Sequence, residues 1–72
     1  MNYHLFHARL CTARRRANLT QAGLAAKVAM RQQYIAALER GAREQLRAET
    51  LFKLARALHV DAAWLAGEDG ER

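Results

Sequence analysis

The stretch TQAGLAAKVAMRQQYIAALERG, residues 20–41, decides the fold. Thr20 is of a type that caps helix N-termini, and apolar residues follow it at helical spacing, so we predict a short helix that begins after Thr20. Residues 32–40 form a second helical pattern, and Gly41 suits the left-handed position that ends a helix. We expect residues 29–31 to form a tight turn between the two helices. This stretch therefore predicts two short helices joined by a turn.

Helices are also expected on both sides of this pair. Residues 3–17 carry apolar side chains at the spacing of one helix face, at Phe6, Leu10, Ala13 and Ala17. Residues 48–58 repeat the pattern, at Leu51, Leu54, Ala55 and Leu58. The polar segment 42–47 is expected to be a loop, and Asp61 is a candidate N-cap for a short last helix that stops at Gly67.

Size and composition agree with a small helical domain. The chain has 72 residues, of which 51% are hydrophobic, and it contains no proline. A chain of this length buries one modest core. We predict a single all-α domain of five short helices over residues 1–67, with a short polar tail at residues 68–72.

Several classes of site are not expected. Cys11 is the only cysteine, so neither an internal disulfide nor a thiolate metal cluster can form. His4 and His7 are three positions apart but lack a third ligand, so we expect no metal and no cofactor. We expect neither an enzyme nor a small-molecule ligand, because no polar constellation of the catalytic kind is present. With no apolar run of about 18 residues and no secretory leader, we expect a cytoplasmic protein that does not enter membranes.

Net charge indicates an acidic partner. The formal charge is +5 and the isoelectric point is near 10.4. Such a balance favours nucleic acid over a membrane surface, although many basic proteins are merely well solvated.

The predicted helix at 32–40 has one side suited to the major groove of DNA. A helical wheel places Tyr34, Ile35 and Leu38 on the inner side; the outer side carries Gln32, Gln33, Ala36, Ala37 and Arg40. Glutamine can form a bidentate pair with adenine, and small alanines let a helix approach the base edges closely. We therefore predict that DNA bases are read by this surface, at Gln32, Gln33, Ala36 and Ala37. The alternative is that two glutamines simply lie on a solvated helix face.

Residues 20–41 resemble the helix-turn-helix of phage repressors and Cro proteins. A second block, ETLFKLARALHVDAAWLAGE at residues 49–68, is similar to the closing two helices of that family. The resemblance covers about Phe6 to Gly67 and implies a fold like that of the lambda repressor DNA-binding domain. In this family, the second helix of the motif lies in the major groove.

The resemblance also implies roles for individual residues. Gln21 matches a family glutamine that grips a DNA phosphate at a helix N-terminus, and Arg47 matches a loop arginine near the minor groove. The complete set of expected phosphate contacts is Gln21, Arg31, Tyr34, Arg40, Arg43 and Arg47. Arg14 and Glu39 match a buried ion pair, which would account for an arginine on the apolar face of its helix. A weak dimer contact is expected at Ala48, Val60 and Trp64, although Trp64 could simply complete the core.

The chain departs from the family pattern at two turns. Ala29 and His59 stand where the family commonly has glycine, and a left-handed conformation at either residue would cost about 1–2 kcal/mol. Ala37 lacks a hydrogen-bonding group, so it could contact a base only through an apolar group such as the thymine methyl.

These observations predict a regulator of transcription that binds double-stranded DNA. We expect a repressor of phage or prophage type that reads a palindromic operator as a dimer, with half-sites about 34–36 Å apart. The rival prediction is an antitoxin or another protein-interaction module built on the same fold.

Overall fold

The computed structural model describes residues 1–42 and 46–68, and their secondary structure is entirely helical. The five helices are α1 (Tyr3–Arg16), α2 (Gln21–Lys27), α3 (Gln32–Arg40), α4 (Ala48–Leu58) and α5 (Ala62–Leu65). This confirms the predicted all-α fold. Of the predicted tail at residues 68–72, only Glu68 lies within the described part of the chain.

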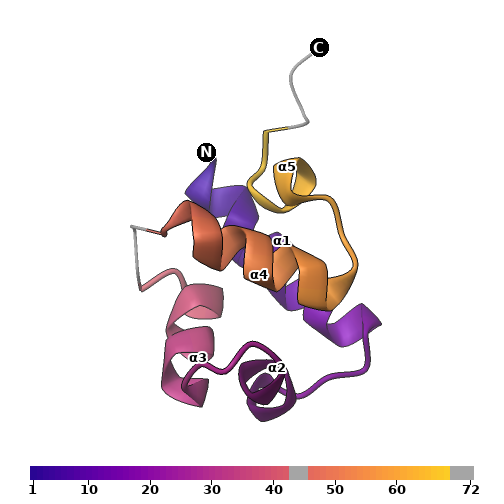
Figure 1. The fold of residues 1–72 in the computed structure, drawn as a ribbon. Helices are drawn as coiled ribbons and strands as arrows, with labels where there is room; N and C mark the ends of the chain where they lie inside the picture. The colour runs from indigo at the N-terminus through magenta and orange to yellow at the C-terminus, as the bar shows by residue number, and fades with distance from the viewer. Residues whose placement is uncertain (43–45, 69–72) are drawn as a thin grey trace.

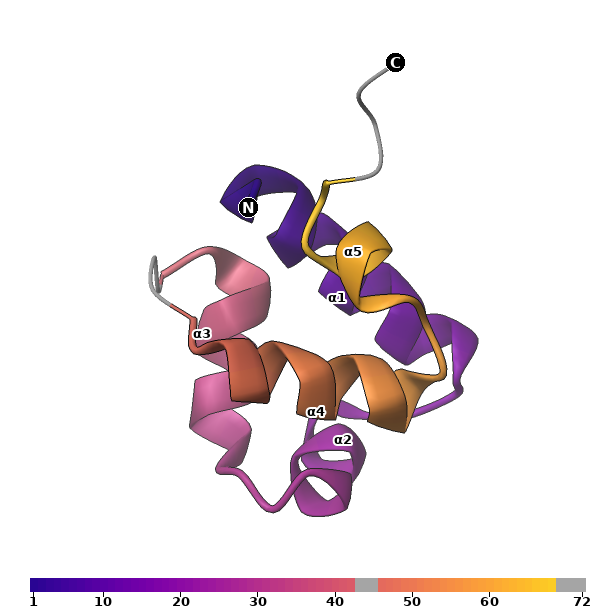
Figure 2. The same cartoon turned by 45° about the horizontal axis from the view of Figure 1, so that its top comes forward.

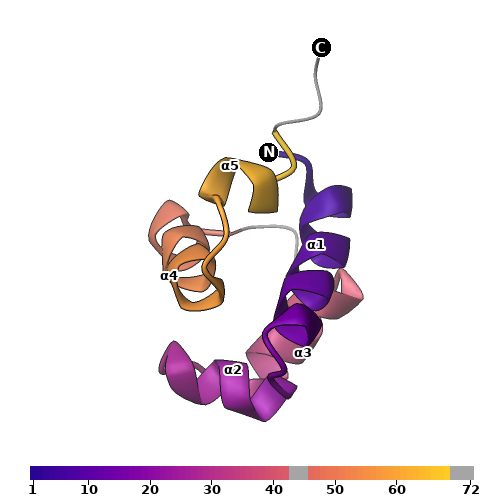
Figure 3. The ribbon, with the colours of Figure 1, turned by 90° about the vertical axis from the view of Figure 1, so that its right-hand side faces the viewer.

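The helices surround a single core, with α2 and α5 at opposite ends of the molecule. Figure 1 shows α4 in front of α1, α2 below them, and α5 above. The views in Figure 2 and Figure 3 show the same order, with α3 beside α2. The helix-turn-helix therefore forms one end of the molecule.

Every helix contributes at least one fully buried side chain to this core. These side chains are Phe6, Leu10, Leu24, Ile35, Leu38, Leu54 and Leu65. Burying each leucine or phenylalanine contributes about 1.5–3 kcal/mol. Because α2 and α3 are too short to be stable alone, this shared core holds the motif in place.

The predicted helix ends agree with the structure except at two places. The Thr20 hydroxyl accepts a hydrogen bond from the Gly23 amide at 2.9 Å, and Gly41 ends α3 with φ of 79°, both as predicted. The first helix ends at Arg16 rather than Ala17, which is exposed, because Asn18 turns the chain with φ of 59°. Asp61 precedes α5, but its side chain makes no capping hydrogen bond.

The two turns that depart from the family pattern do adopt the left-handed conformation. Ala29 has φ of 57° and His59 has φ of 58°. A β-carbon in this region costs about 1–2 kcal/mol. Both residues therefore carry the backbone strain that was expected from the sequence.

The inner face of α4 differs slightly from the expected one. Leu54, Ala55 and Leu58 are buried, whereas Leu51 is only half-buried and packs at the edge of the core. Thr50, which the apolar pattern did not include, is also buried. The buried stripe of α4 is therefore displaced by one position at its N-terminal end.

Candidate nucleic-acid interface

The turn between α2 and α3 fixes how the second helix of the motif stands on the first. The Met30 amide donates to the Ala25 carbonyl at 2.9 Å, and the Val28 amide donates to the Leu24 carbonyl at 3.1 Å. Val28 is buried, and Met30 packs against the core. The chain thus leaves α2 through a hydrogen-bonded turn, and α3 begins at a defined angle.

The N-terminal end of α3 is open to solvent. Gln32 and Gln33 are its first two residues and both are exposed, while Ala36 and Ala37 on the same side are half-buried. Arg31 precedes the helix and its side chain makes no capping hydrogen bond. The side chain at the N-cap position therefore does not occupy the amides of the first turn, and helix N-termini of this kind favour phosphate oxygens.

Near its C-terminal end, α3 is joined to α1 by a bidentate ion pair. Arg14 Nε lies 2.6 Å from Glu39 Oε2, and Arg14 Nη2 lies 3.1 Å from Glu39 Oε1. Only 12% of the Arg14 side chain and 6% of the Glu39 side chain are exposed. Arg14 Nη1 also donates to the Leu19 carbonyl at 2.8 Å. The arginine on the apolar face of α1 therefore has its charge partner.

Gln21 belongs to the same cluster. Its Nε2 donates to Glu39 Oε1 at 3.1 Å, and the residue is half-buried at the start of α2. A glutamine amide carries two N–H groups, so one remains for another acceptor. The contact was not anticipated from the sequence, because it joins side chains that are 18 positions apart.

The surroundings of Glu39 lower the pKa of its carboxyl. Burial is the largest single influence and raises the pKa, but it is outweighed by hydrogen bonds from Arg14 and Gln21 together with the positive charge of Arg14. The hydrogen bond to Glu39 in turn raises the pKa of Arg14. Both groups are therefore charged at neutral pH, and the net charge of the pair is zero.

Because the Arg14–Glu39 pair is neutral overall, the exposed charge of the helix-turn-helix is set by its other charged residues. Glu39 is the only acidic residue in positions 1–43, and its carboxylate is turned inward and paired. The exposed charges of α2, α3 and the turn between them are those of Lys27, Arg31 and Arg40. A surface with cations and no free carboxylate attracts the phosphate backbone of DNA.

The predicted phosphate contacts lie in different settings. Three of the arginines are exposed. Arg31 lies immediately before α3, Arg40 is the last residue of α3, and Arg47 lies immediately before α4. Tyr34 is half-buried and packs against the core. Arg43 lies outside the described residues. Exposed arginines thus lie at both ends of α3 and at the start of α4.

The residues expected at a dimer contact lie at the two ends of α4 and in α5. Ala48 is exposed, and Val60 and Trp64 are half-buried. The Arg9 guanidinium lies 5.0 Å from the centre of the Trp64 ring and donates to the Trp64 carbonyl. This contact ties α5 to α1, so part of the tryptophan surface is committed to the fold.

An exposed aromatic ring beside these residues was missed in the sequence analysis. Phe52 is 53% exposed and borders a shallow hollow of ≈ 240 Å³, whose other walls include Leu51, Ala62 and Ala63. The signal was present in the sequence, because Phe52 falls outside the buried stripe of α4. A large apolar residue on the polar side of a surface helix is a candidate for contact with another molecule.

The histidines and the cysteine weighed in the sequence analysis form no metal site within the described residues. The structure groups no three metal-ligating residues among those it describes. His7 packs against Gly41, and Cys11 lies beside the Arg14 guanidinium. Within residues 1–42 and 46–68, no helix is long and apolar enough to cross a membrane.

The fold and this surface define a helix-turn-helix DNA-binding domain. The family model for helix-turn-helix domains matches residues 12–65, and the chain belongs to this family, in its Cro and repressor type. It is a family of DNA-binding domains and not of enzymes. No curated protein and no solved structure matches the chain significantly.

Proposed function

We propose that the chain is a transcriptional repressor of phage or prophage type that binds a palindromic operator as a dimer. The observation that carries the proposal is the open N-terminal end of α3, where Gln32 and Gln33 are exposed beside small alanines. Glutamine can pair with the N6 and N7 edge of adenine. The neighbouring carboxylate, Glu39, is withdrawn into an ion pair and repels no phosphate.

The backbone contacts follow from the cations around α3. Arg31 and Arg40 are exposed at the two ends of the helix, and Arg47 is exposed at the start of α4. These arginines would meet phosphates of the DNA backbone. The remaining N–H of Gln21 would reach a phosphate at the start of α2. Phosphate contacts fix the position of a protein on the duplex, whereas base contacts supply the specificity.

The dimer contact is assigned to the surface formed by α4 and α5. In addition to Ala48, Val60 and Trp64, it includes Phe52, whose ring would be half-exposed in a lone subunit. The ring and the hollow beside it lie on one surface, so two copies related by a two-fold axis could each insert a ring into the other's hollow. An interface this small forms weakly off DNA.

Selection of bound sites from a random duplex pool tests the proposal. We expect inverted repeats with half-sites one helical turn apart, about 34–36 Å. A single unrepeated site would contradict the dimer. The absence of duplex binding even at low salt would contradict the whole proposal, and would favour a protein-interaction module such as an antitoxin.

The variant Phe52→Ser tests the dimer separately. It removes an exposed ring, so we expect the fold to be retained and the cooperativity of binding to the inverted repeat to fall, while single half-sites are bound as before. Lys53→Ser, at the neighbouring position of α4, is the matched control. Equal cooperativity in wild type and Phe52→Ser would exclude Phe52 from the contact.

A further inference from the structure

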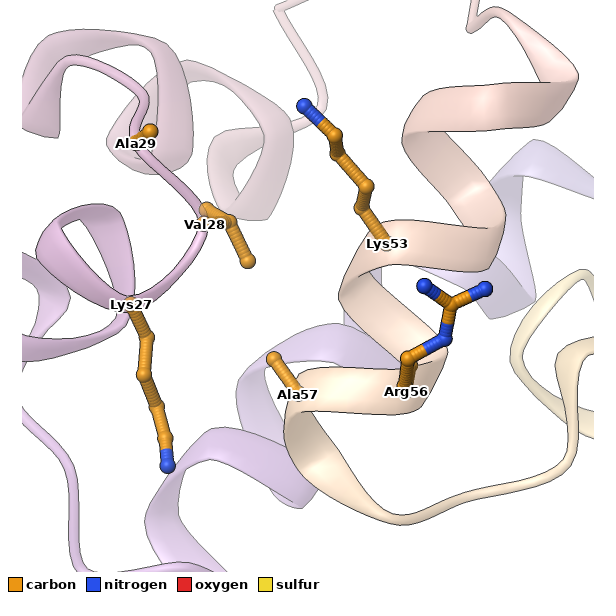
Figure 4. Close-up of a pocket in the computed structure, with 6 residues that line it drawn as sticks. All are labelled: Lys27, Val28, Ala29, Lys53, Arg56 and Ala57. Atoms are coloured by element: carbon orange, nitrogen blue, oxygen red, sulfur yellow. The ribbon is translucent and has the colours of Figure 1, made fainter.

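A groove between the end of α2 and α4 has no part in the proposed reading of DNA bases. It has a volume of ≈ 430 Å³. Its lining residues are Lys27, Val28, Ala29, Lys53, Arg56 and Ala57. Figure 4 shows Lys27 and the turn residues on one side of the groove, and the three α4 residues on the other.

The rim of the groove is cationic. Lys27, Lys53 and Arg56 are exposed, and none forms an ion pair or hydrogen bond with another described residue. The lining contains no carboxylate. Figure 4 shows the charged ends of these side chains at different parts of the rim, so an anion at the groove would be attracted from more than one side.

The floor of the groove is apolar. Val28 is 6% exposed, and the methyl groups of Ala29 and Ala57 lie beside it. Lysine and arginine stems add further apolar surface below their charged ends. A phosphate group alone would leave this floor uncovered, whereas an aliphatic side chain would remove it from water.

We propose that this groove binds an acidic segment of a protein partner, with carboxylates on the cationic rim and an aliphatic side chain on the floor. The charge of the rim selects an anionic segment, and the floor distinguishes a peptide from the backbone of DNA. This inference is independent of operator reading. A partner held here would contact the turn at Ala29, directly before the helix that carries Gln32 and Gln33.

A short acetylated and amidated peptide, in which two leucines are flanked by glutamates, is a suitable probe. It is titrated into the isotope-labelled chain near physiological ionic strength, where long-range attraction between exposed charges is largely screened. We expect backbone amide signals at residues 27–29 and 53–57 to shift. Replacing both leucines with serine is expected to weaken binding, because the floor is then left uncovered.

Two variants with equal loss of charge locate the site. In Lys53→Gln/Arg56→Gln we expect binding to weaken by roughly threefold to tenfold, as for the loss of two exposed ion pairs. In Arg15→Gln/Arg16→Gln, which removes two exposed cations of α1, we expect no change. Thermal unfolding of both variants shows whether the fold is intact.

Three results would overturn the proposal. Signal changes spread over all the cationic surfaces, or equal binding of the leucine and serine peptides, would reduce the effect to general charge attraction. The third result concerns the slope of the logarithm of the DNA-binding constant against the logarithm of salt concentration. If Lys53→Gln/Arg56→Gln made this slope shallower by about 2, the groove would be assigned to the DNA backbone.

Discussion

The two ends of α3 use polar residues in opposite ways. Near the C-terminal end, Glu39 is held by Arg14 and Gln21 and is almost completely buried. At the N-terminal end, Gln32 and Gln33 are exposed. Gln21 and Gln33 are the same residue type, yet one is engaged within the fold and the other faces solvent. Position relative to the core, rather than residue type, decides whether a glutamine amide is partly engaged within the fold or fully open to solvent.

The ion pair of Glu39 should respond most strongly to substitution. Glu39→Gln removes the partner of a nearly buried arginine, which we expect to cost roughly 3 kcal/mol or more of unfolding free energy. Glu49→Gln, the same change in the exposed first turn of α4, should cost about 0.3–1 kcal/mol through the helix dipole. Urea unfolding measures both.

The paired variant Arg14→Met/Glu39→Met sharpens this test. It removes both charges at once, and we expect it to be more stable than Glu39→Gln, because no charge remains stranded. If the single and paired variants were equally destabilised, the loss would come from packing and not from an unpaired arginine.

The same pair predicts how stability changes with pH. The pKa of Glu39 is lowered in the folded state, so the folded chain holds a proton on this group less readily than the unfolded chain. Its contribution is therefore complete above the unfolded pKa of about 4.3 and is lost as the pH falls through the lower folded pKa. Unfolding followed between neutral and acid pH should show this loss in wild type and Glu49→Gln but not in Glu39→Gln.

The turn between the two helices should give a smaller effect of opposite sign. Ala29→Gly relieves a left-handed strain of about 1–2 kcal/mol, and the greater freedom of glycine in the unfolded chain offsets about 0.4–1 kcal/mol of this gain. We expect the unfolding free energy to rise by up to about 1.6 kcal/mol. Ala26→Gly, at an exposed helical position, is the control and should lower it; a loss in both variants would contradict the strain.

Local rules were enough to predict most of the fold from the sequence. The Thr20 cap, the Gly41 terminator and the apolar spacing each depend on residues a few positions apart. The structure agrees with the cap and the terminator, and with the spacing except at Ala17 and Leu51. The end of α1 was misplaced because alanine suits a helix, whereas the left-handed conformation of Asn18 ends it at Arg16.

The site was only partly predictable. Exposure of Gln32 and Gln33 follows from the helical wheel, a local property. The hydrogen bond from Gln21 to Glu39 and the stacking of Arg9 on Trp64 depend on how separate helices pack, which spacing within one helix does not reveal. The groove beside Lys53 likewise exists only because α2 and α4 meet.

The central claim is that the outer side of α3 reads bases, and a comparison of Gln33→Ala with Arg31→Ala tests it most directly. Affinities of both variants are measured on the selected operator and on unrelated duplex across a range of salt concentrations. For Gln33→Ala we expect a loss of about 1–3 kcal/mol on the operator alone. For Arg31→Ala we expect a loss on every duplex and a salt slope shallower by about 0.9. If Gln33→Ala instead weakened binding to all sequences equally, the base-reading role of this surface would be contradicted.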